Sequence, residues 1–409
     1  MNLISLFFYL FFILVAPSPI LTGTENLISI KNSIGGIFFV ASTNVEDLRV
    51  KYSIAKNGDD PIRILIVPGH DNSSVGAQFR KVKESDLTVE LAGYLAALFS
   101  KEKEFETIPV RTRAGYAPQF ASYFSEERAA IKSFAKTYRA YTQTVINAGL
   151  VTSHEGVAHN DASEEGAIKL YGVNKWANEN QIDFVLHIHF NDHGGRPRNR
   201  VGKYSGFSIY IPERQYSNAG PSAVIAKSVL NRLITYAAPS DMPQESAGII
   251  EDQGLIAVGS NNSLNPASIL IEYDYIYEPQ FQNSETRYAI LNELAFQTYL
   301  GIKDFFAGGV LDTPKIFETT LLPHAWNRNM EEGLVGSLDV LSLQAALLRE
   351  GVYPPSGSTK NDCPITGSFG KCTIASVKEF QKKNGIEPAT GYVGTQTRKV
   401  LNEKYGTSE

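Results

Sequence analysis

Three strongly apolar segments of this chain each end on a side chain that can bind a metal ion or move a proton. The segments and the polar residues that follow them are Ile64–Val67 with His70, Phe184–Ile188 with His189, and Ile269–Ile271 with Glu272. Short apolar runs of this kind are typical of strands buried on both faces of a mostly parallel α/β sheet, where ligands gather at the carboxyl ends of the strands. We therefore expect these three side chains to meet in one site.

The segments between these runs predict helices, so we expect an α/β fold with a doubly wound, mostly parallel sheet and helices on both faces. After His70, the spacing of Leu87, Leu91 and Leu95 predicts a helix. Glu84 stands near its first turn, where the helix dipole favours a carboxylate. The alternation is expected to continue with a helix over 125–142, a strand over 206–211, and helices over 222–236 and 285–306.

A repeated pattern marks the end of the chain as a small separate domain. The pattern G-x-x-G-x-x-T occurs at Gly367–Thr373 and at Gly391–Thr397, each time before a helical segment. The glycines allow a tight turn, and each threonine is expected to cap the next helix. Together with a helix over 341–349, these segments predict a three-helix domain. The expected organisation is a signal peptide or membrane anchor at 1–22, a spacer or added edge strand at 23–60, a catalytic domain at 61–307 with an insertion at 114–170, a linker at 308–332 and the small domain at 333–406.

The amino terminus predicts export from the cytoplasm. Residues 3–16 are almost wholly apolar and are followed by Pro17 and Pro19. The stretch is shorter than the roughly 20 residues of a spanning helix and fits the core of a signal peptide. No Lys or Arg precedes it, so an uncleaved membrane anchor is the alternative. We expect the protein in the cell envelope, either periplasmic or extracellular. A formal net charge of −5 argues against nucleic acid as its partner.

Cys363 and Cys372 are the two cysteines of the chain, and both lie in the small domain. Outside the cytoplasm they can form a local disulfide, whereas two free buried thiols are the alternative. No histidine accompanies them in the sequence, which argues against a zinc site at this place.

A ligand set for zinc can be drawn from the strand-end residues. A catalytic zinc ion usually has three protein ligands and an open position for water, whose pKa the ion lowers toward neutrality. His70, Glu84 and His189 supply such a set, and Glu272 is then a carboxylate able to take the proton of the attacking water. Each of these residues alone is more often structural, so the prediction depends on all four together.

Five motifs support this interpretation: Val67–His70, Lys83–Leu87, Val110–Arg113, Asp183–Asn191 and Ile269–Glu272. In this order they resemble the motifs of the Amidase_3 family of zinc-dependent N-acetylmuramoyl-L-alanine amidases. The resemblance covers about residues 63–307. It implies Zn²⁺ held by His70, Glu84 and His189, with Glu272 as the catalytic carboxylate. The reaction it implies is cleavage of the amide bond between muramic acid and the first alanine of the peptidoglycan stem peptide.

Residues 333–405 resemble a type 1 peptidoglycan-binding domain. Leu343-Gln344, Phe380-Gln381 and the two glycine turns fall where that family has them. Peptidoglycan is thus the implied substrate and anchor, in cell-wall remodelling or lysis. Two other classes stay open, namely a catalytically silent or regulatory wall-binding protein and a zinc hydrolase of another cell-wall bond. The need for an activator protein is open as well.

Three histidines call for separate interpretation. His187 replaces the serine that the family usually has, and strand alternation places it on the side of His189, as an extra ligand or as a group behind the ligands. His154 and His159 resemble an H-E-x-x-H zinc helix only superficially, because their spacing is one residue too long, so a solvated loop is expected. The insertion that contains them, 114–170, follows a strand near the site, and our hypothesis is that it gates the cleft.

Overall fold

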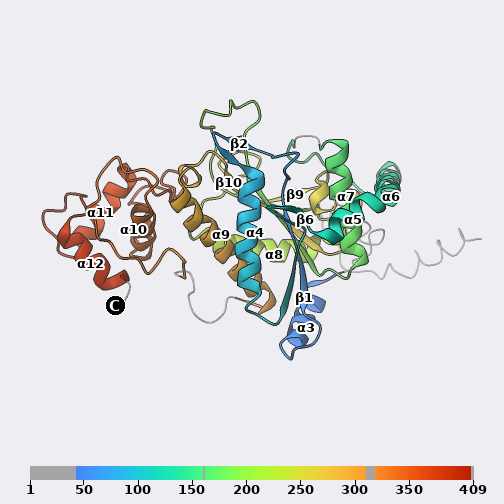
Figure 1. The fold of residues 1–409 in the computed structure, drawn as a ribbon, viewed down its shortest axis with the longest axis horizontal. Coiled ribbons are helices and arrows are strands. Elements are labelled where there is room, and N and C mark those ends of the chain that lie inside the picture. Colours follow the sequence, from blue (N-terminus) through green and yellow to red (C-terminus); the bar gives the residue numbers. More distant parts are fainter. Residues whose placement is uncertain (1–42, 160–161, 310–317, 407–409) are drawn as a thin grey trace, which may run out of the picture.

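A six-stranded sheet forms the centre of the larger domain. The computed structural model describes residues 43–159, 162–309 and 318–406. The strand order is β4-β1-β7-β10-β8-β9 (Figure 1). The strands are β1 (Ile62–Pro68), β4 (Phe105–Pro109), β7 (Phe184–Asn191), β8 (Ser208–Pro212), β9 (Ile249–Asp252) and β10 (Ala267–Tyr275). β4, β1, β7 and β10 are parallel, whereas β8 runs antiparallel to β10 and pairs in parallel with β9. The predicted mostly parallel sheet is confirmed.

Helices cover both faces of this sheet. Ile64 and Ile66 of β1 belong to a core shared with α4 (Glu84–Phe99), α8 (Ala219–Leu233) and α9 (Ser284–Phe306). Leu65 and Val67 point to the other face, into a core shared with α5 (Pro118–Glu126), α6 (Arg128–Asn147) and α7 (Glu164–Glu179). Figure 1 shows α4 and α9 on one side of the sheet and α5, α6 and α7 on the other. Burial on both faces explains why the strand sequences are apolar without alternation.

Short elements complete the larger domain. They are the two-stranded ribbons β2 (Gln78–Phe79) with β3 (Val82–Lys83) and β5 (Arg111–Thr112) with β6 (Gly115–Tyr116), and the 3-10 turns η1 (Ile256–Val258), η2 (Ser260–Asn262) and η3 (Pro279–Phe281). β2 and β3 precede α4 directly, so they lead the chain from the end of β1 to the first residue of that helix.

Residues 45–55 form a helix, within the segment 23–60 that we expect to be a spacer or an added edge strand. Within 23–60, α3 (Val45–Ala55) buries Leu48, Tyr52 and Ala55, which have helical spacing. Tyr52 packs against the rings of Phe105 and Phe306, with centroids 5.5 and 5.4 Å away. The edge strand is therefore wrong for 45–55, while residues 1–42, with the expected signal peptide or anchor, lie outside the described residues. Among the helices that the structure describes, none is long and apolar enough to span a bilayer.

The loop after α6 is solvent-exposed, as expected, but hydrogen bonds also tie it to the sheet. The His159 ring lies 3.0 Å from the carboxylate of the buried Asp252, and the backbone N–H of His154 donates to the side chain of Gln253 at 2.9 Å. The loop is thus fixed to the sheet near the end of β9. Its acceptors come from a segment far along the chain, which is why local sequence gave no sign of these contacts.

Three helices form the small domain, as expected: α10 (Leu338–Arg349), α11 (Lys371–Lys383) and α12 (Thr395–Tyr405). A buried glutamine organises each repeat. Gln344 accepts hydrogen bonds from the N–H groups of Thr366 and Gly367 and donates to the Thr373 hydroxyl, and Gln381 makes the equivalent bonds to the second repeat. The threonines are not helix caps, because Gly370 and Gly394 occupy those positions. Their hydroxyls serve the glutamines instead.

A loop of the small domain docks on the larger one. Cys363 and Cys372 form a disulfide that fastens this loop to α11, so of the two alternatives the disulfide is present. Lys360 donates to the backbone carbonyls of Ile234 and Thr235, at the carboxyl end of α8. Asn361 adds a hydrogen bond of 3.1 Å to the carbonyl of Pro239. A cation at a helix carboxyl end is favoured by the helix dipole.

Candidate active site

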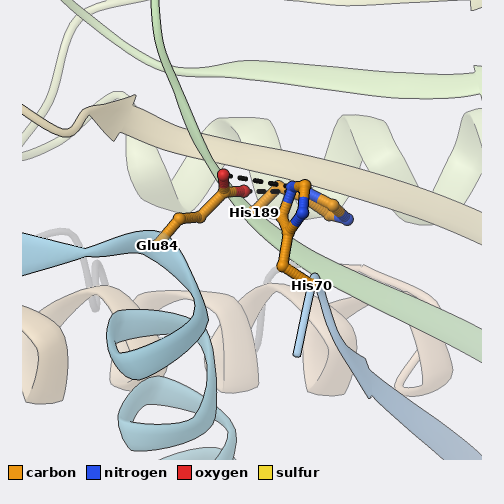
Figure 2. Close-up of side chains that lie close together, drawn as sticks. All are labelled: His70, Glu84 and His189. Carbon is orange, nitrogen blue, oxygen red and sulfur yellow. Dashed lines mark hydrogen bonds and ion pairs between the residues drawn. The ribbon is translucent and has the colours of Figure 1, made fainter. Parts of the chain in front are cut away.

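Two histidines and a glutamate converge at the carboxyl ends of the parallel strands. His70 follows β1, Glu84 is the first residue of α4, and His189 lies near the end of β7. One side-chain donor atom from each lies within 4.8 Å of the other two. Glu84 bridges the histidines, with Oε2 3.1 Å from His70 Nε2 and Oε1 2.9 Å from His189 Nδ1 (Figure 2). The structure therefore brings together the three residues that the sequence predicted as ligands.

Two glycines leave the room that this cluster occupies. A Cβ atom at Gly69 would come within 2.3 Å of the His189 ring, and one at Gly76 would come within 2.3 Å of Glu84 Oε2. His70 has φ of 61°, a left-handed conformation that is uncommon for residues other than glycine. The backbone is shaped here around the three polar side chains.

Arg111 connects the backbone segments that carry His70 and Glu84. Its buried guanidinium donates to the carbonyls of Pro68, Gly69 and Ser85, at 3.1, 2.7 and 3.0 Å. These carbonyls belong to the segments that carry His70 and Glu84. The planar, always charged guanidinium can satisfy several acceptors at once, so Arg111 holds the two segments in register. We did not predict this role, although Arg111 lies in one of the five motifs.

The cluster shifts the proton affinity of its members. Burial lowers the pKa of His189, and the charge of Glu84 opposes this without overcoming it. For His70 burial also acts to lower the pKa, but the charge and hydrogen bond of Glu84 outweigh it and raise the pKa above its usual value. Burial acts to raise the pKa of Glu84, yet the two histidines hold it far below its usual value. Glu84 is therefore a carboxylate at neutral pH, as a metal ligand must be.

Glu272 lies beside the cluster on the neighbouring strand. In the pairing of β10 with β7, it is directly opposite His189. Its Oε2 atom is buried and has no hydrogen-bond partner. Burial, followed by the negative charges of Glu84 and Glu245, raises the pKa of Glu272 well above its usual value. A buried carboxyl group with a raised pKa beside such a cluster is a candidate for proton transfer.

The insertion reaches the site through Asp71. Lys169 of α7 contacts the Asp71 carboxylate at 2.6 Å, and the Tyr116 hydroxyl donates to it at 3.0 Å. Burial acts to raise the pKa of Asp71, but the hydrogen bonds from Lys169 and the Ser73 hydroxyl outweigh it and lower the pKa. Asp71 directly follows His70, so these contacts join the insertion to the segment that carries a predicted ligand. Asp71 was not among the predicted site residues, although its place directly after His70 was a usable signal.

His187 lies outside the cluster. It is fully buried, two residues before His189 on the same strand, and neither ring nitrogen has a hydrogen-bond partner of good geometry. Burial is the main cause that lowers its pKa to about 3, and His189 adds to the effect. A strand rises about 3.3 Å per residue, so two positions along β7 place His187 several ångströms below the ligand group. Of the two alternatives, a direct ligand position is wrong in this arrangement.

A zinc ion fits the residues that are present. Two imidazoles and one carboxylate are a donor set of catalytic zinc sites, which leave one position open. Here the donor atoms converge, the two glycines keep their surroundings clear, and the unpaired Oε2 of Glu272 stands next to them. His154 and His159 take no part in the cluster.

The fold and this site together define a class of protein, an α/β domain with a His-Glu-His cluster able to hold a metal ion at the ends of its parallel strands, followed by a small helical domain. The family model of N-acetylmuramoyl-L-alanine amidases matches residues 64–304, more than half of the chain. The chain therefore belongs to the N-acetylmuramoyl-L-alanine amidase family, as its motifs suggested. A second family model, that of a peptidoglycan binding domain, matches residues 336–401.

Solved structures of amidases are similar to part of this chain. One is an N-acetylmuramoyl-L-alanine amidase from Clostridium difficile 630, with 17% identity, a TM-score of 0.38 and coverage of 60% of this chain and 97% of that one. Another is from Nostoc punctiforme, with 15% identity, a TM-score of 0.36 and coverage of 60% and 97%. A third, from Mycobacterium smegmatis, has 15% identity, a TM-score of 0.36 and the same coverage. No curated protein sequence matches the chain.

Proposed function

We propose that this protein is an exported, zinc-dependent N-acetylmuramoyl-L-alanine amidase, which cleaves the amide bond between N-acetylmuramic acid and the L-alanine of the stem peptide. The observation that carries the proposal is the convergence of His70, Glu84 and His189, with Glu272 opposite His189, in a chain of the amidase family. In this proposal His70, Glu84 and His189 hold zinc. Bound zinc supplies a Lewis acid for the amide carbonyl and lowers the pKa of a water molecule.

Glu272 is the group that moves the proton. Its unpaired Oε2 accepts a proton from the attacking water, and the same oxygen then donates it to the nitrogen of the departing alanine. Burial, the first cause of the raised pKa of Glu272, favours its protonated form, which the second step needs. Glu84 stays ionised throughout and keeps both histidines oriented through its two oxygens.

The small domain serves as an anchor on the same polymer. A domain that binds insoluble peptidoglycan raises the local concentration of the catalytic domain without taking part in the chemistry. Action on the cell wall also agrees with the expected export and with a periplasmic or extracellular location. The predicted roles of the amino terminus and of an activator protein stay predictions.

Product analysis tests the proposal directly. Purified residues 23–409 with zinc are incubated with peptidoglycan, and mass spectrometry is used to identify the products. Free stem peptides that begin with alanine are expected from the wild type, with loss of at least about 10²-fold in rate for Glu272→Gln. Removal of zinc by a chelator should abolish the activity, and added zinc should restore it. Released acetate or shortened peptides would instead indicate a hydrolase of another bond, and no product from a zinc-loaded protein would indicate a silent wall-binding protein.

The gating role of the insertion needs a separate test. Arg128 contacts Glu165 at 2.8 Å, so the two ends of the segment 128–163 lie close together and a short linker can replace it. This deletion spares α7, which contributes to the core and holds Asp71. If the segment gates the cleft, the shortened protein should act faster on soluble muropeptides. If the shortened protein had wild-type rates on both soluble muropeptides and intact sacculi, the segment would not be a gate.

A further inference from the structure

Glu245 is a buried carboxylate that the proposed reaction does not use. It lies in the turn between α8 and β9 and is 2% exposed. The surrounding sequence, Met242-Pro-Gln-Glu245, has neither an apolar run nor a motif that marks a site. Burying a carboxylate is costly unless its oxygens are well hydrogen-bonded. The contacts of Glu245 therefore bear directly on its role.

Both oxygens of Glu245 accept hydrogen bonds, from the last residues of β7 and β10 and from the middle of β8. The Asn191 side-chain amide of β7 lies 2.9 and 3.0 Å from the two oxygens. The Tyr210 hydroxyl of β8 donates at 2.6 Å and the Tyr275 hydroxyl of β10 at 3.2 Å. The donors are an amide and two phenols, all neutral. One carboxylate thus connects β7, β8 and β10.

Both strand ends carry residues of the site. Asn191 is two residues beyond His189, and Tyr275 is three residues beyond Glu272. Glu272 pairs with His189 and Tyr275 pairs with Asn191, so the register of β10 against β7 shifts between the two pairs. Such an irregularity re-aims side chains at the end of a strand and leaves the ladder locally weaker. Glu245 binds both partners directly beyond this shift.

We propose that Glu245 is a positioning residue, which fixes the shifted ends of β7 and β10 so that Glu272 faces the His70–Glu84–His189 cluster. The proposal rests on the proposed function. Hydrogen bonds to a carboxylate are shorter and stronger than those between neutral partners. Glutamine at this position has one acceptor oxygen instead of two, so at least one of the three donors would lose its acceptor and the clamp would loosen. The charge of Glu245 also contributes to the raised pKa of Glu272.

Kinetics of Glu245→Gln test this role. A displacement of about 1 Å at a catalytic group costs roughly 10²-fold in rate. We expect kcat to fall by about 30- to 100-fold, with KM within about twofold of the wild type and zinc content unchanged. The matched control is Glu213→Gln. Glu213 is another buried glutamate, directly after the carboxyl end of β8, and its carboxylate accepts a hydrogen bond from the backbone N–H of Gln215 at 3.0 Å. It should leave kcat unchanged.

A swap variant separates the clamp from a general structural role. Asn191→Asp combined with Glu245→Gln restores an amide–carboxylate pair with reversed direction, and kcat should recover to within about fivefold of the wild type. A kcat of Glu245→Gln within twofold of the wild type would overturn the proposal. Loss of zinc or of folding in Glu245→Gln would also overturn it. The same holds if the double variant is as slow as Glu245→Gln alone.

Hydrogen exchange provides a measurement without substrate. The N–H of Ile276 donates to the carbonyl of Asn191 at 2.9 Å, directly beyond the register shift. Glu245→Gln should speed exchange in the peptide that contains Ile276 by about tenfold, while peptides of β1 stay unchanged. Unchanged exchange would overturn the clamp even if the protein turned out to cleave another bond. Faster exchange in a protein that releases no alanine-terminated peptide would contradict only the proposed function.

Discussion

Gln344 in the small domain and Glu272 in the larger one are polar side chains in packed surroundings, yet their hydrogen bonding differs. Gln344 is 1% exposed, and both its oxygen and its nitrogen have partners. The buried Oε2 of Glu272 has none, and its carboxyl group stands among other negative charges that raise its pKa. Satisfied polar groups help to specify a fold, whereas a buried unsatisfied group is costly and needs an explanation, which for Glu272 is the proposed chemistry. The comparison predicts which substitutions affect stability and which affect activity.

Glu84→Gln should have the largest effect, because this residue is at once a satisfied group and a proposed ligand. Its oxygens contact two histidines and accept the N–H groups of Ala77 and Phe190 at 2.8 and 3.2 Å. We expect zinc affinity to fall by at least about 10²-fold and the rate by about 10³-fold. Metal analysis and the peptidoglycan assay measure both. Glu90→Gln, at the surface of the same helix, is the control, and a Glu84→Gln protein with full zinc would contradict the ligand role.

Gln344→Ala should mainly reduce stability. It leaves the N–H groups of Thr366 and Gly367 without their acceptor, so we expect the small domain to lose about 3 kcal/mol. Trp326 is buried against this domain and Trp176 lies in α7, so tryptophan fluorescence in single-tryptophan variants follows each domain separately. The rate on soluble muropeptides should not change.

Gln381→Ala is the matched variant in the second repeat. Gln381 accepts from one backbone N–H group, that of Gly391, where Gln344 accepts from two. Its replacement should therefore cost less than that of Gln344. An equal or larger loss of stability would contradict the argument from unsatisfied groups.

Acid should weaken the small domain through Glu350. Burial acts to raise the pKa of this carboxyl, but Lys383, Tyr405 and Lys404 outweigh it and lower the pKa to about 2. Because the folded-state pKa is depressed, the stabilisation is present above the unfolded value of about 4.3 and is lost as the pH falls toward 2. We expect a loss of about 2 kcal/mol over this range, measured by Trp326 fluorescence. Glu350→Gln should make this domain less sensitive to pH, and an unchanged acid transition in that variant would contradict the assignment.

His187→Leu should have the smallest effect of these substitutions, and it should raise the stability of its domain where the glutamine substitutions lower it. The imidazole is buried without good partners, so an apolar side chain of similar size removes a desolvation cost. The larger domain should gain about 1 kcal/mol, read from thermal unfolding, and the rate should stay within a fewfold of the wild type. A large loss of activity would show that His187 acts on the ligands, and the comparison would then have to include it among the functional groups.

The strand-end residues were predictable because their signal is local. His70, His189 and Glu272 each follow an apolar run, and parallel strands bring such ends together. Glu84 was predictable from the helix that it starts. His187 was correctly placed on the side of His189, but the alternation of a strand gives the face and not the depth along it. Its separation from the cluster follows from the rise of the strand.

Other features depend on contacts that no local pattern records. Glu245 acquires its partners from three strands, and its own segment is an ordinary polar turn. β8 runs antiparallel to β10 because of the path of the chain between β7 and β8. The apolar pattern of a buried strand does not indicate its direction, so the sequence did not predict this. Thr373 and Thr397 were interpreted as caps, whereas their place one turn inside each helix is set by the glutamines that they bind.

The contact of Lys360 with the end of α8 changes how the anchor works. A domain on a free tether lets the enzyme reach any bond within the length of the tether. Here Lys360 and Asn361 seat the small domain on the larger one, and the Cys363–Cys372 bond fastens the loop that carries them. In the proposed function this seating restricts how far the catalytic site can lie from the bound polymer, so we expect cleaved bonds at a narrower range of distances from the binding place than a free tether would allow.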